Sequence, residues 1–338
     1  MALRGGRRSV AGSGACNLLP VRILAAGESG DPRGAVSTIG VFDGVHRGHQ
    51  AVLAKVTEAA RQRDAAATVV TFHPHPVRVI DPLRAPPLIE SLELRLKRFA
   101  AAGIEQVHIV HFDETTKDEE AAAFVARVVV GQLRAHEVIV GDDFRFGRQR
   151  GGDVATLAAA GIDVDALGAI GDVRRYSSTV ARQAIARGDL VEAVKVLGRS
   201  VVVSGEVVHG DGRGGKELGF PTANLATVAE VVTPGEGVYA AMAQLADQRW
   251  WPCAVSIGRR PQFLSGADVL IEGHVLGDVG DLYGQWVSFV LLEYLRGEAT
   301  FATVDDLKAQ MHADVVATEV IARGWDRLDL QRAVGDVA

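Results

Sequence analysis

Short apolar stretches alternate with segments of helical spacing between Val36 and about Gly188. The sequence predicts strands at 36–42, 67–72, 106–111, 137–140 and 162–167, and helices at 48–62, 92–102, 119–131 and 179–187. Strands and helices that alternate in this way form a parallel sheet covered by helices on both faces. We therefore predict an α/β doubly wound domain, in which ligands bind at the carboxyl ends of the strands.

The chain changes character after about Leu197, where β-rich stretches are separated by glycine and proline. Strands are predicted at 201–208, 237–245, 251–257, 269–276 and 287–292, followed by a helix at 304–322. Short strands at this spacing are typical of a small antiparallel β-barrel, and the C-terminal helix would pack outside it. We predict a flexible N-terminal extension at 1–34, a first domain at 35–188 and a barrel domain at 189–338.

Composition argues against several classes of protein. A net charge of −6 and an aromatic content of 6% are unlike the basic, stacking surface of a nucleic-acid binder. No segment approaches the ~18 apolar residues of a membrane span. Cys16 and Cys253 fit no zinc or disulfide spacing, which favours a reducing compartment, and we expect a cytoplasmic protein. Arg7 and Arg8 with Cys16 loosely match a secretion leader, but the apolar region of such a signal is missing.

The segment Gly40–His49, where the first predicted strand turns into a helix, carries two histidines three residues apart. A helix begins there, so His46 and His49 lie at or just inside its N-terminus, where unpaired backbone N–H groups and the helix dipole attract anions. Gly40, Gly44 and Gly48 allow a polyphosphate to approach the backbone closely. Two imidazoles at this place can stabilise charge that develops on a phosphoryl group. The alternative is a pair of ordinary surface histidines.

A second phosphate-binding motif is predicted at Arg175–Arg182. Ser178 or Thr179 can cap a helix here, which leaves backbone N–H groups available to a phosphate. Arg182, one helical turn further on, offers a bidentate charged group. Taken alone, the segment would also fit a simple capping sequence.

Two further segments partly match known binding motifs, but in neither does the sequence support the match. Gly210–Lys216 satisfies G-x-G-x-x-G and part of a P-loop, but Glu217 replaces the required Ser or Thr and no helix opens after it. A flexible glycine loop that leads into Gly219–Asn224 is the better interpretation. His73 and His75 suggest a metal site, but no third ligand has suitable spacing and the prolines beside them explain a rigid loop.

Together these motifs resemble a known family. The core H-x-G-H, inside G-x-F-D-G-x-H-x-G-H at 40–49, resembles the signature of nucleotidyltransferases that move AMP or CMP from a nucleoside triphosphate. The longer string is similar to that of the prokaryotic bifunctional riboflavin kinase/FAD synthetases, and the resemblance extends from about Val36 to about Ala322. It implies that ATP phosphorylates riboflavin to FMN in the barrel, and that ATP then adenylylates FMN to FAD in the first domain. It also implies Mg²⁺, with riboflavin, FMN and ATP as small-molecule partners.

In the first domain, the resemblance implies that His46 and His49 stabilise the transition state, while Arg182 and Mg²⁺ hold the pyrophosphate. The predicted nucleotide- and phosphate-binding residues are Gly40, Phe42, Asp43, Gly48, Ser178 and Thr179. The loops after the second and fourth strands would contact the flavin, through Phe72, His75, Asp143 and Phe144.

In the barrel domain, the resemblance places Mg²⁺ and ATP phosphates at Thr222 and Asn224. Glu272 would accept the proton of the riboflavin hydroxyl; its alternative is an inward glutamate paired with an arginine. The loop residues predicted to bind nucleotide are Gly210, Gly212, Gly214 and Lys216, and Arg296 is a predicted flavin contact. Arg259, Arg260 and Gln262 replace the small polar side chains usual in the family, which either reshapes the riboflavin pocket or is surface variation.

Two other functions stay open on the sequence alone. One is a diverged nucleotidyltransferase/kinase paralogue that acts on a flavin analogue, and the other is a flavin- or nucleotide-binding regulator with weak or no kinase turnover. The regulator is disfavoured because the residues expected to carry the chemistry are intact. As partners we expect neither nucleic acid nor membrane, and weak self-association is left open.

Overall fold

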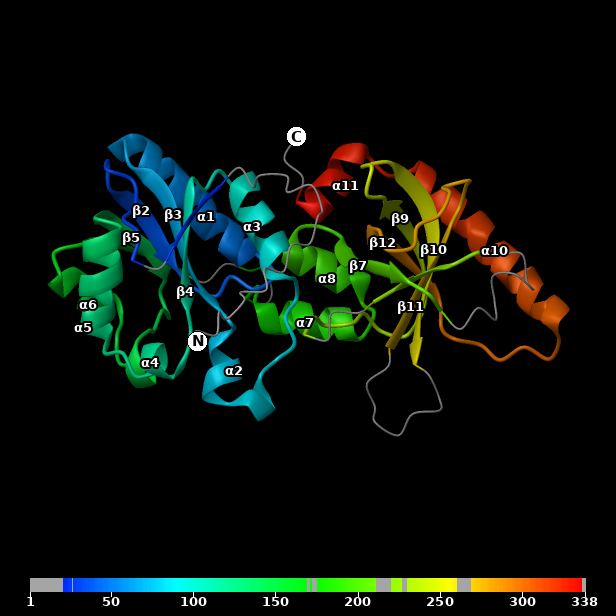
Figure 1. The fold of residues 1–338 in the computed structure, drawn as a ribbon, viewed down its shortest axis with the longest axis horizontal. Helices are drawn as coiled ribbons and strands as arrows, with labels where there is room; N and C mark the ends of the chain where they lie inside the picture. Colours follow the sequence, from blue (N-terminus) through cyan, green and yellow to red (C-terminus); the bar gives the residue numbers. More distant parts are fainter. Residues whose placement is uncertain are drawn as a thin grey trace, which may run out of the picture.

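A computed structural model of the chain has two lobes joined by a pair of helices (Figure 1). It describes residues 21–25, 27–168, 171, 175–210, 220–226, 230–259 and 269–335. Within these ranges, no helix is long and apolar enough to cross a membrane.

The first lobe is built on a six-stranded sheet in the order β1-β4-β3-β2-β5-β6, in which all paired strands are parallel. The strands are β1 (Arg22–Leu24), β2 (Ala35–Ile39), β3 (Ala66–His73), β4 (Gln106–His111), β5 (Ala135–Gly141) and β6 (Asp163–Leu167). The chain passes from β2 through β3 to β4 and then returns to the other side of β2. The strand order therefore reverses beside β2, and ligands bind at the carboxyl ends of strands at such a point.

Helices cover both faces of this sheet, which confirms the predicted α/β doubly wound fold. The α-helices between β2 and β6 are α1 (Arg47–Arg63), α2 (Pro76–Ile80), α3 (Leu92–Ala101), α4 (Glu114–Lys117), α5 (Ala121–Phe124) and α6 (Val154–Ala159). Leu53 of α1 and Phe99 of α3 belong to the apolar cluster on one face. Phe124 of α5 belongs to the cluster on the other. The helix predicted at 119–131 is α5 followed by a π-helix at Val125–Gln132.

Strand β1 corrects the predicted N-terminal extension. Arg22 pairs with Gln106 of β4, and Leu24 is buried in the apolar cluster. The part of the extension that the structure describes therefore contains a strand of the sheet, and a flexible segment as far as residue 34 was wrong. A strand of three residues is too short to show the two-residue period from which strands are predicted.

The second lobe is a closed antiparallel barrel in the order β10-β11-β8-β7-β12-β9, as predicted. Its strands are β7 (Val201–Val208), β8 (Ala223–Leu225), β9 (Gly237–Gln244), β10 (Trp250–Arg259), β11 (Val269–Val275) and β12 (Trp286–Arg296). Helix α10 (Val304–Arg323) packs outside the barrel (Figure 1). The short β8 and a last helix, α11 (Arg327–Val334), were not predicted.

Helices α7 (Ser178–Ala186) and α8 (Leu190–Leu197) lie between the two lobes (Figure 1). Ala184 and Ile185 of α7 belong to the same buried cluster as Leu197 and the barrel residue Phe289. Apolar packing thus continues across the boundary predicted between residues 188 and 189, and α7 shares the core of the barrel lobe.

Candidate active sites

The segment between β2 and α1 brings His46 and His49 together at the helix N-terminus. His46 is the N-cap of α1, and its Nδ1 accepts a hydrogen bond from the backbone N–H of His49 at 3.4 Å. The two imidazole rings stack with centroids 3.6 Å apart, and the Phe42 ring lies 4.9 Å from the His49 ring. A Cβ on Gly48 would lie 3.1 Å from the His46 ring, so glycine lets the imidazole pack against the helix start.

Both imidazoles are neutral near pH 7 in the absence of a ligand. Burial, together with the nearby charges of Arg175 and Arg199, lowers the pKa of His46 to about 4. Burial and the adjacent His46 hold the pKa of His49 well below its ordinary value. The Nδ1 atom of His49 is buried and has no hydrogen-bond partner among the described residues. A bound polyphosphate would raise both pKa values, because an adjacent negative charge favours the protonated imidazole.

Arg182 of α7 connects the second predicted motif to the same place. Its Nη2 donates to the buried carboxylate of Asp43 at 3.0 Å, and its Nε donates to the carbonyl of Pro87 at 2.6 Å. The hydroxyl of Ser178 donates to the Asp43 carbonyl at 2.9 Å. The backbone N–H of Ile89 completes the partners of the Asp43 carboxylate. These contacts make one site out of two motifs that are distant in the chain.

The cap of α7 differs from the prediction. Ser177 is the N-cap, and its hydroxyl accepts from the backbone N–H of Val180 at 3.3 Å. Ser178 and Thr179 are the first two helical residues, so neither caps the helix. Ser177 takes this place because its extended backbone carries the hydroxyl to the first turn, whereas the Ser178 hydroxyl is directed to Asp43.

Aromatic side chains line the loops after β3 and β5, where flavin contacts were predicted. Phe72 lies edge-on to Phe112 with ring centroids 5.9 Å apart. Phe144 stacks on Phe146 at 5.1 Å, and Phe146 in turn lies 5.9 Å from Phe124. This part of the sheet edge can therefore contact a flat ring system.

His75 and Asp143, the polar residues predicted at the flavin, are held by neighbours. His75 is the N-cap of α2, and burial with the charge of Arg182 lowers its pKa to about 4. Asp143 forms a bidentate ion pair with Arg175, at 2.7 and 2.9 Å. Among the described residues, no group of three or more His, Cys, Asp or Glu side chains is arranged to hold a metal ion.

The candidate kinase residues lie on paired barrel strands. Asn224 of β8 is the direct partner of Glu272 of β11. Thr222 lies just before β8. Asn224 is buried, and its Oδ1 has no hydrogen-bond partner in the part of the chain that the structure describes. A Cβ on Gly210 would lie 2.5 Å from the Asn224 amide, so only glycine leaves room for this side chain.

Glu272 is on the outer side of its strand. Ile271 and Val275 are buried in the barrel cluster, and Glu272 alternates with them. The inward glutamate considered from the sequence is therefore wrong, because side chains alternate between the two faces of a strand. On the same outer side, the Phe220 ring lies 5.1 Å from the His274 ring and 5.0 Å from the His312 ring of α10.

Other predicted residues of the barrel lobe form ion pairs or lie outside the described ranges. Arg296 pairs with Asp314 of α10 at 2.7 Å, which joins β12 to α10. Arg259 pairs with Glu236 at 2.7 Å. The predicted residues outside the described ranges are Gly212, Gly214, Lys216, Arg260 and Gln262.

Buried arginines were missed by sequence reasoning. Arg95 of α3 is 1% exposed and donates to the carbonyl of Val41, in the segment that precedes the histidines. Arg98, one turn later, is 7% exposed. The available signal was their spacing, since both lie on the same face of the helix as Leu96 and Phe99. A charge on an apolar helix face is buried only when it has partners.

Each lobe matches a family model. Residues 28–179 match the FAD synthetase model, and residues 197–322 match the riboflavin kinase model. The chain is 39% identical to the bifunctional riboflavin kinase/FMN adenylyltransferase of Escherichia coli K12, over 83% of this chain and 90% of that protein. It is 38% identical to the corresponding protein of Pseudomonas fluorescens, over 86% of this chain and 94% of that one. A crystal structure from Streptococcus pneumoniae, described as a macrolide-efflux protein, has 27% identity and a TM-score of 0.80, over 91% of this chain and 100% of that chain.

Proposed function

The chain belongs to the family of bifunctional riboflavin kinase/FMN adenylyltransferases, and from this premise we propose how its residues divide the two reactions. It is a transferase with two activities. One converts riboflavin and ATP into FMN and ADP, and the other converts FMN and ATP into FAD and pyrophosphate. Two findings carry this function. Each lobe matches a different family model, and the bifunctional relatives align with both lobes. The comparisons provide no support for the paralogue or the regulator.

We assign adenylyl transfer to the first lobe. A phosphate oxygen of FMN attacks the α-phosphorus of ATP, and the bond from that phosphorus to the β-phosphate oxygen breaks, so negative charge builds on the departing pyrophosphate. His46, His49 and the N-terminus of α1 would stabilise this charge. Arg182 would contact the pyrophosphate through Nη1, because Pro87 and Asp43 already engage its Nε and Nη2.

We assign riboflavin phosphorylation to the outer side of β8 and β11. Glu272 would take the proton from the riboflavin hydroxyl as that oxygen attacks the γ-phosphorus of ATP. Thr222 and the buried Asn224 would hold Mg²⁺, since the unpartnered Oδ1 of Asn224 is the kind of oxygen ligand that this ion prefers. When bound, Mg²⁺ neutralises charge on the phosphates.

Further assignments rest on the same premise. We propose an adenylyltransferase domain that includes β1 and ends at residue 188, and a kinase domain at 189–338, with α7 packed against the second. We also propose a cytoplasmic location, where ATP is available. Riboflavin, FMN and ATP are the partners, without nucleic acid, as supported by the acidic balance of the chain.

The function is tested by incubation of the purified protein with riboflavin, ATP and Mg²⁺. FMN should appear first and FAD afterwards, and chromatography separates the three flavins. Omission of Mg²⁺ should stop both steps. A folded protein that forms neither FMN nor FAD would contradict the assignment.

A further inference from the structure

The segment Val41–Val45, which leads to the two histidines, has a strained backbone. The φ angles are 55° at Phe42, 74° at Gly44 and 33° at Val45. A positive φ is rare for residues other than glycine, and it is least favourable for a β-branched side chain such as valine. Such a conformation persists only where the surrounding structure holds it.

The carbonyl groups of this segment are held by donors from several elements. The side chains that donate to them are Arg95 and Thr71 at Val41, Ser178 at Asp43, Arg199 at Gly44, and Gln50 and Arg199 at Val45. A carbonyl oxygen repels a polyphosphate, whereas a backbone N–H attracts it. Donors that keep these carbonyl oxygens directed into the protein therefore leave the opposite side of the segment favourable for an anion.

Arg199 stands apart because it comes from the other half of the chain. It follows α8, within the segment that matches the riboflavin kinase model. Its Nη2 donates to the Gly44 carbonyl at 2.7 Å, and its Nη1 lies 3.4 Å from the Val45 carbonyl. Gln50 strengthens the same junction, since its amide donates to both Val45 and Leu197 at 2.8 Å.

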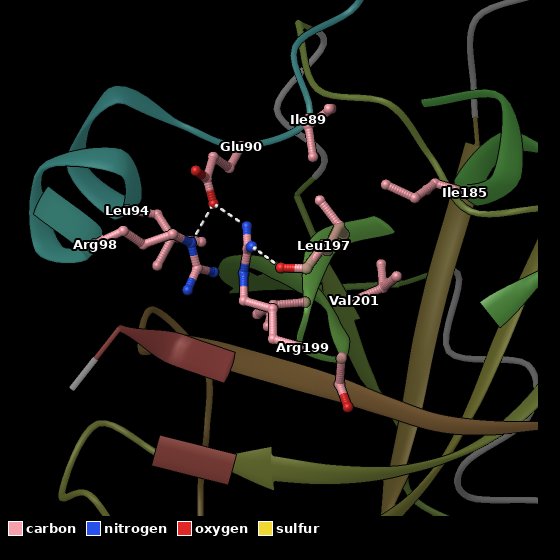
Figure 2. Close-up of a pocket in the computed structure, with 10 residues that line it drawn as sticks. Ile89, Glu90, Leu94, Arg98, Ile185, Leu197, Arg199 and Val201 are labelled. Atoms are coloured by element: carbon pink, nitrogen blue, oxygen red, sulfur yellow. Dashed lines mark hydrogen bonds and ion pairs between the residues drawn. The ribbon is translucent and has the colours of Figure 1, made fainter. Parts of the chain in front are cut away.

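A buried carboxylate holds Arg199 in this position. Glu90 accepts hydrogen bonds from Arg199 and from Arg98, and the three charged groups line a small pocket between the lobes (Figure 2). The side chains of Arg199 and Glu90 are only 8% and 3% exposed. A charge in such surroundings is stable only with its partners, so the arrangement leaves the Arg199 side chain little freedom.

We propose that Arg199 is a positioning residue for adenylyl transfer, supplied to the transferase site by the kinase half of the chain. The proposal rests on the assignment of adenylyl transfer to the first lobe. Arg199 holds the carbonyl groups of Gly44 and Val45 in the strained segment, and it thereby sets the positions of His46 and His49. Its charge is also among the causes that lower the pKa of His46, which indicates that its field extends to the site of the departing anion.

Arg98 provides a matched control. It shares Glu90 with Arg199, but its other donors bind the carbonyls of Arg332 at 3.1 Å and Ala333 at 2.7 Å, in α11. Arg199→Met and Arg98→Met each remove one buried arginine and leave Glu90 paired with the other. Both changes should lower the melting temperature, but only Arg199→Met releases the segment before the histidines.

The experiment measures kcat and KM for both reactions in the full-length wild type, Arg199→Met, Arg199→Lys and Arg98→Met. We expect Arg199→Met to lower kcat for FMN adenylylation about 100-fold, the scale of a misplaced catalytic group, with a smaller change in KM. Arg199→Lys, which keeps one charged donor, should recover part of the loss. Riboflavin phosphorylation should stay within about threefold of the wild type in all variants, which also reports that they are folded.

Adenylylation within about threefold of the wild type in Arg199→Met would overturn the proposal. An equal loss in Arg199→Met and Arg98→Met, or a parallel loss of both activities, would also overturn it, because it would indicate a structural role alone. If Arg199→Met is insoluble, Arg199→Lys against Arg98→Lys gives the same contrast. A wild type without FMN adenylylation would instead refute the function assigned to the first lobe.

Discussion

The proposed transferase site is held by side chains from both lobes, whereas the proposed kinase residues lie on barrel strands that pair through their main chains. Arg182 reaches the carboxylate of Asp43 from α7, and Arg199 reaches the Gly44 carbonyl from beyond α8. In contrast, Asn224 and Glu272 face each other across β8 and β11. The kinase site should therefore survive separation from its neighbour, while the transferase site should not.

Substitution of Glu272 should affect the kinase reaction alone. Glu272→Gln keeps the shape of the side chain but removes the base, so riboflavin phosphorylation should slow by about 10²–10⁴ if proton removal is its main role. FMN supplied from outside should still become FAD at the wild-type rate. Steady-state kinetics with riboflavin and with FMN measure the two steps separately. Unchanged kinase turnover would leave Glu272 without a catalytic role.

The reciprocal change lies in the first lobe. His49→Ala removes one imidazole of the stacked pair, and loss of such a transition-state contact typically costs about 10²–10³ in rate. FAD formation should fall by that amount while FMN accumulates. His136→Ala, in the same lobe but on the exposed surface, is a suitable control. An equal fall in FMN synthesis by a folded His49→Ala protein would show that His49 does not serve adenylylation alone.

Fragments test whether the two sites differ in independence. A fragment from Ser177 to Ala338 should phosphorylate riboflavin. Its free energy of unfolding should be about 3 kcal/mol higher than that of a fragment from Asp189 to Ala338, because Ile185 and two alanines of α7 stay in the barrel cluster. A fragment of residues 21–188 lacks Arg199 and should adenylylate FMN at least about tenfold more slowly than the full chain. Urea unfolding and the two assays measure these differences. Full adenylylation by the 21–188 fragment would show that the transferase reaction does not depend on the second lobe.

The stability of the first lobe should depend on pH. His46 has an ordinary pKa of 6.5 when unfolded and about 4 when folded, so the unfolded state binds its proton first as pH falls. Its contribution to the free energy of unfolding is constant above pH 6.5 and declines by roughly 2–3 kcal/mol towards pH 4. His46→Gln should make the decline shallower in urea titrations at successive pH values, while His49 and His75, whose pKa values burial also lowers, keep part of it. The fragment from Ser177, which lacks His46, is the control, and an equally steep decline in His46→Gln would exclude this histidine as the cause.

Much of the fold was predictable because it follows from local patterns. The strand predicted at 106–111 is β4, and the one predicted at 201–208 is β7. Long helices such as α10 also agree within a residue or two. In contrast, β1 and β8 have three residues each and show too little periodicity to be detected.

The site residues, like the fold, were predictable where their placement depends on neighbours in the chain. The placement of His46 and His49 at a helix N-terminus follows from ten consecutive residues, so it was visible in the sequence. The outward side of Glu272 depended on the barrel register, which is set by pairing with Asn224 and by the burial of the alternate residues. Ser177 replaced Ser178 as the cap because Ser178 had a distant partner in Asp43.

The two folds, the histidine pair at a helix start and the family could all be recognised from the sequence, because each depends on residues close together in the chain or on motifs of fixed spacing. The arginines that we propose to complete the transferase site became visible only in the folded chain. Arg199 and Gly44 are 155 residues apart, and nothing in the local pattern of either indicates the other. Their contact exists because α7 and α8 pack against the barrel core and bring the start of β7 beside the segment before α1, where a buried guanidinium finds Glu90 and two carbonyl groups.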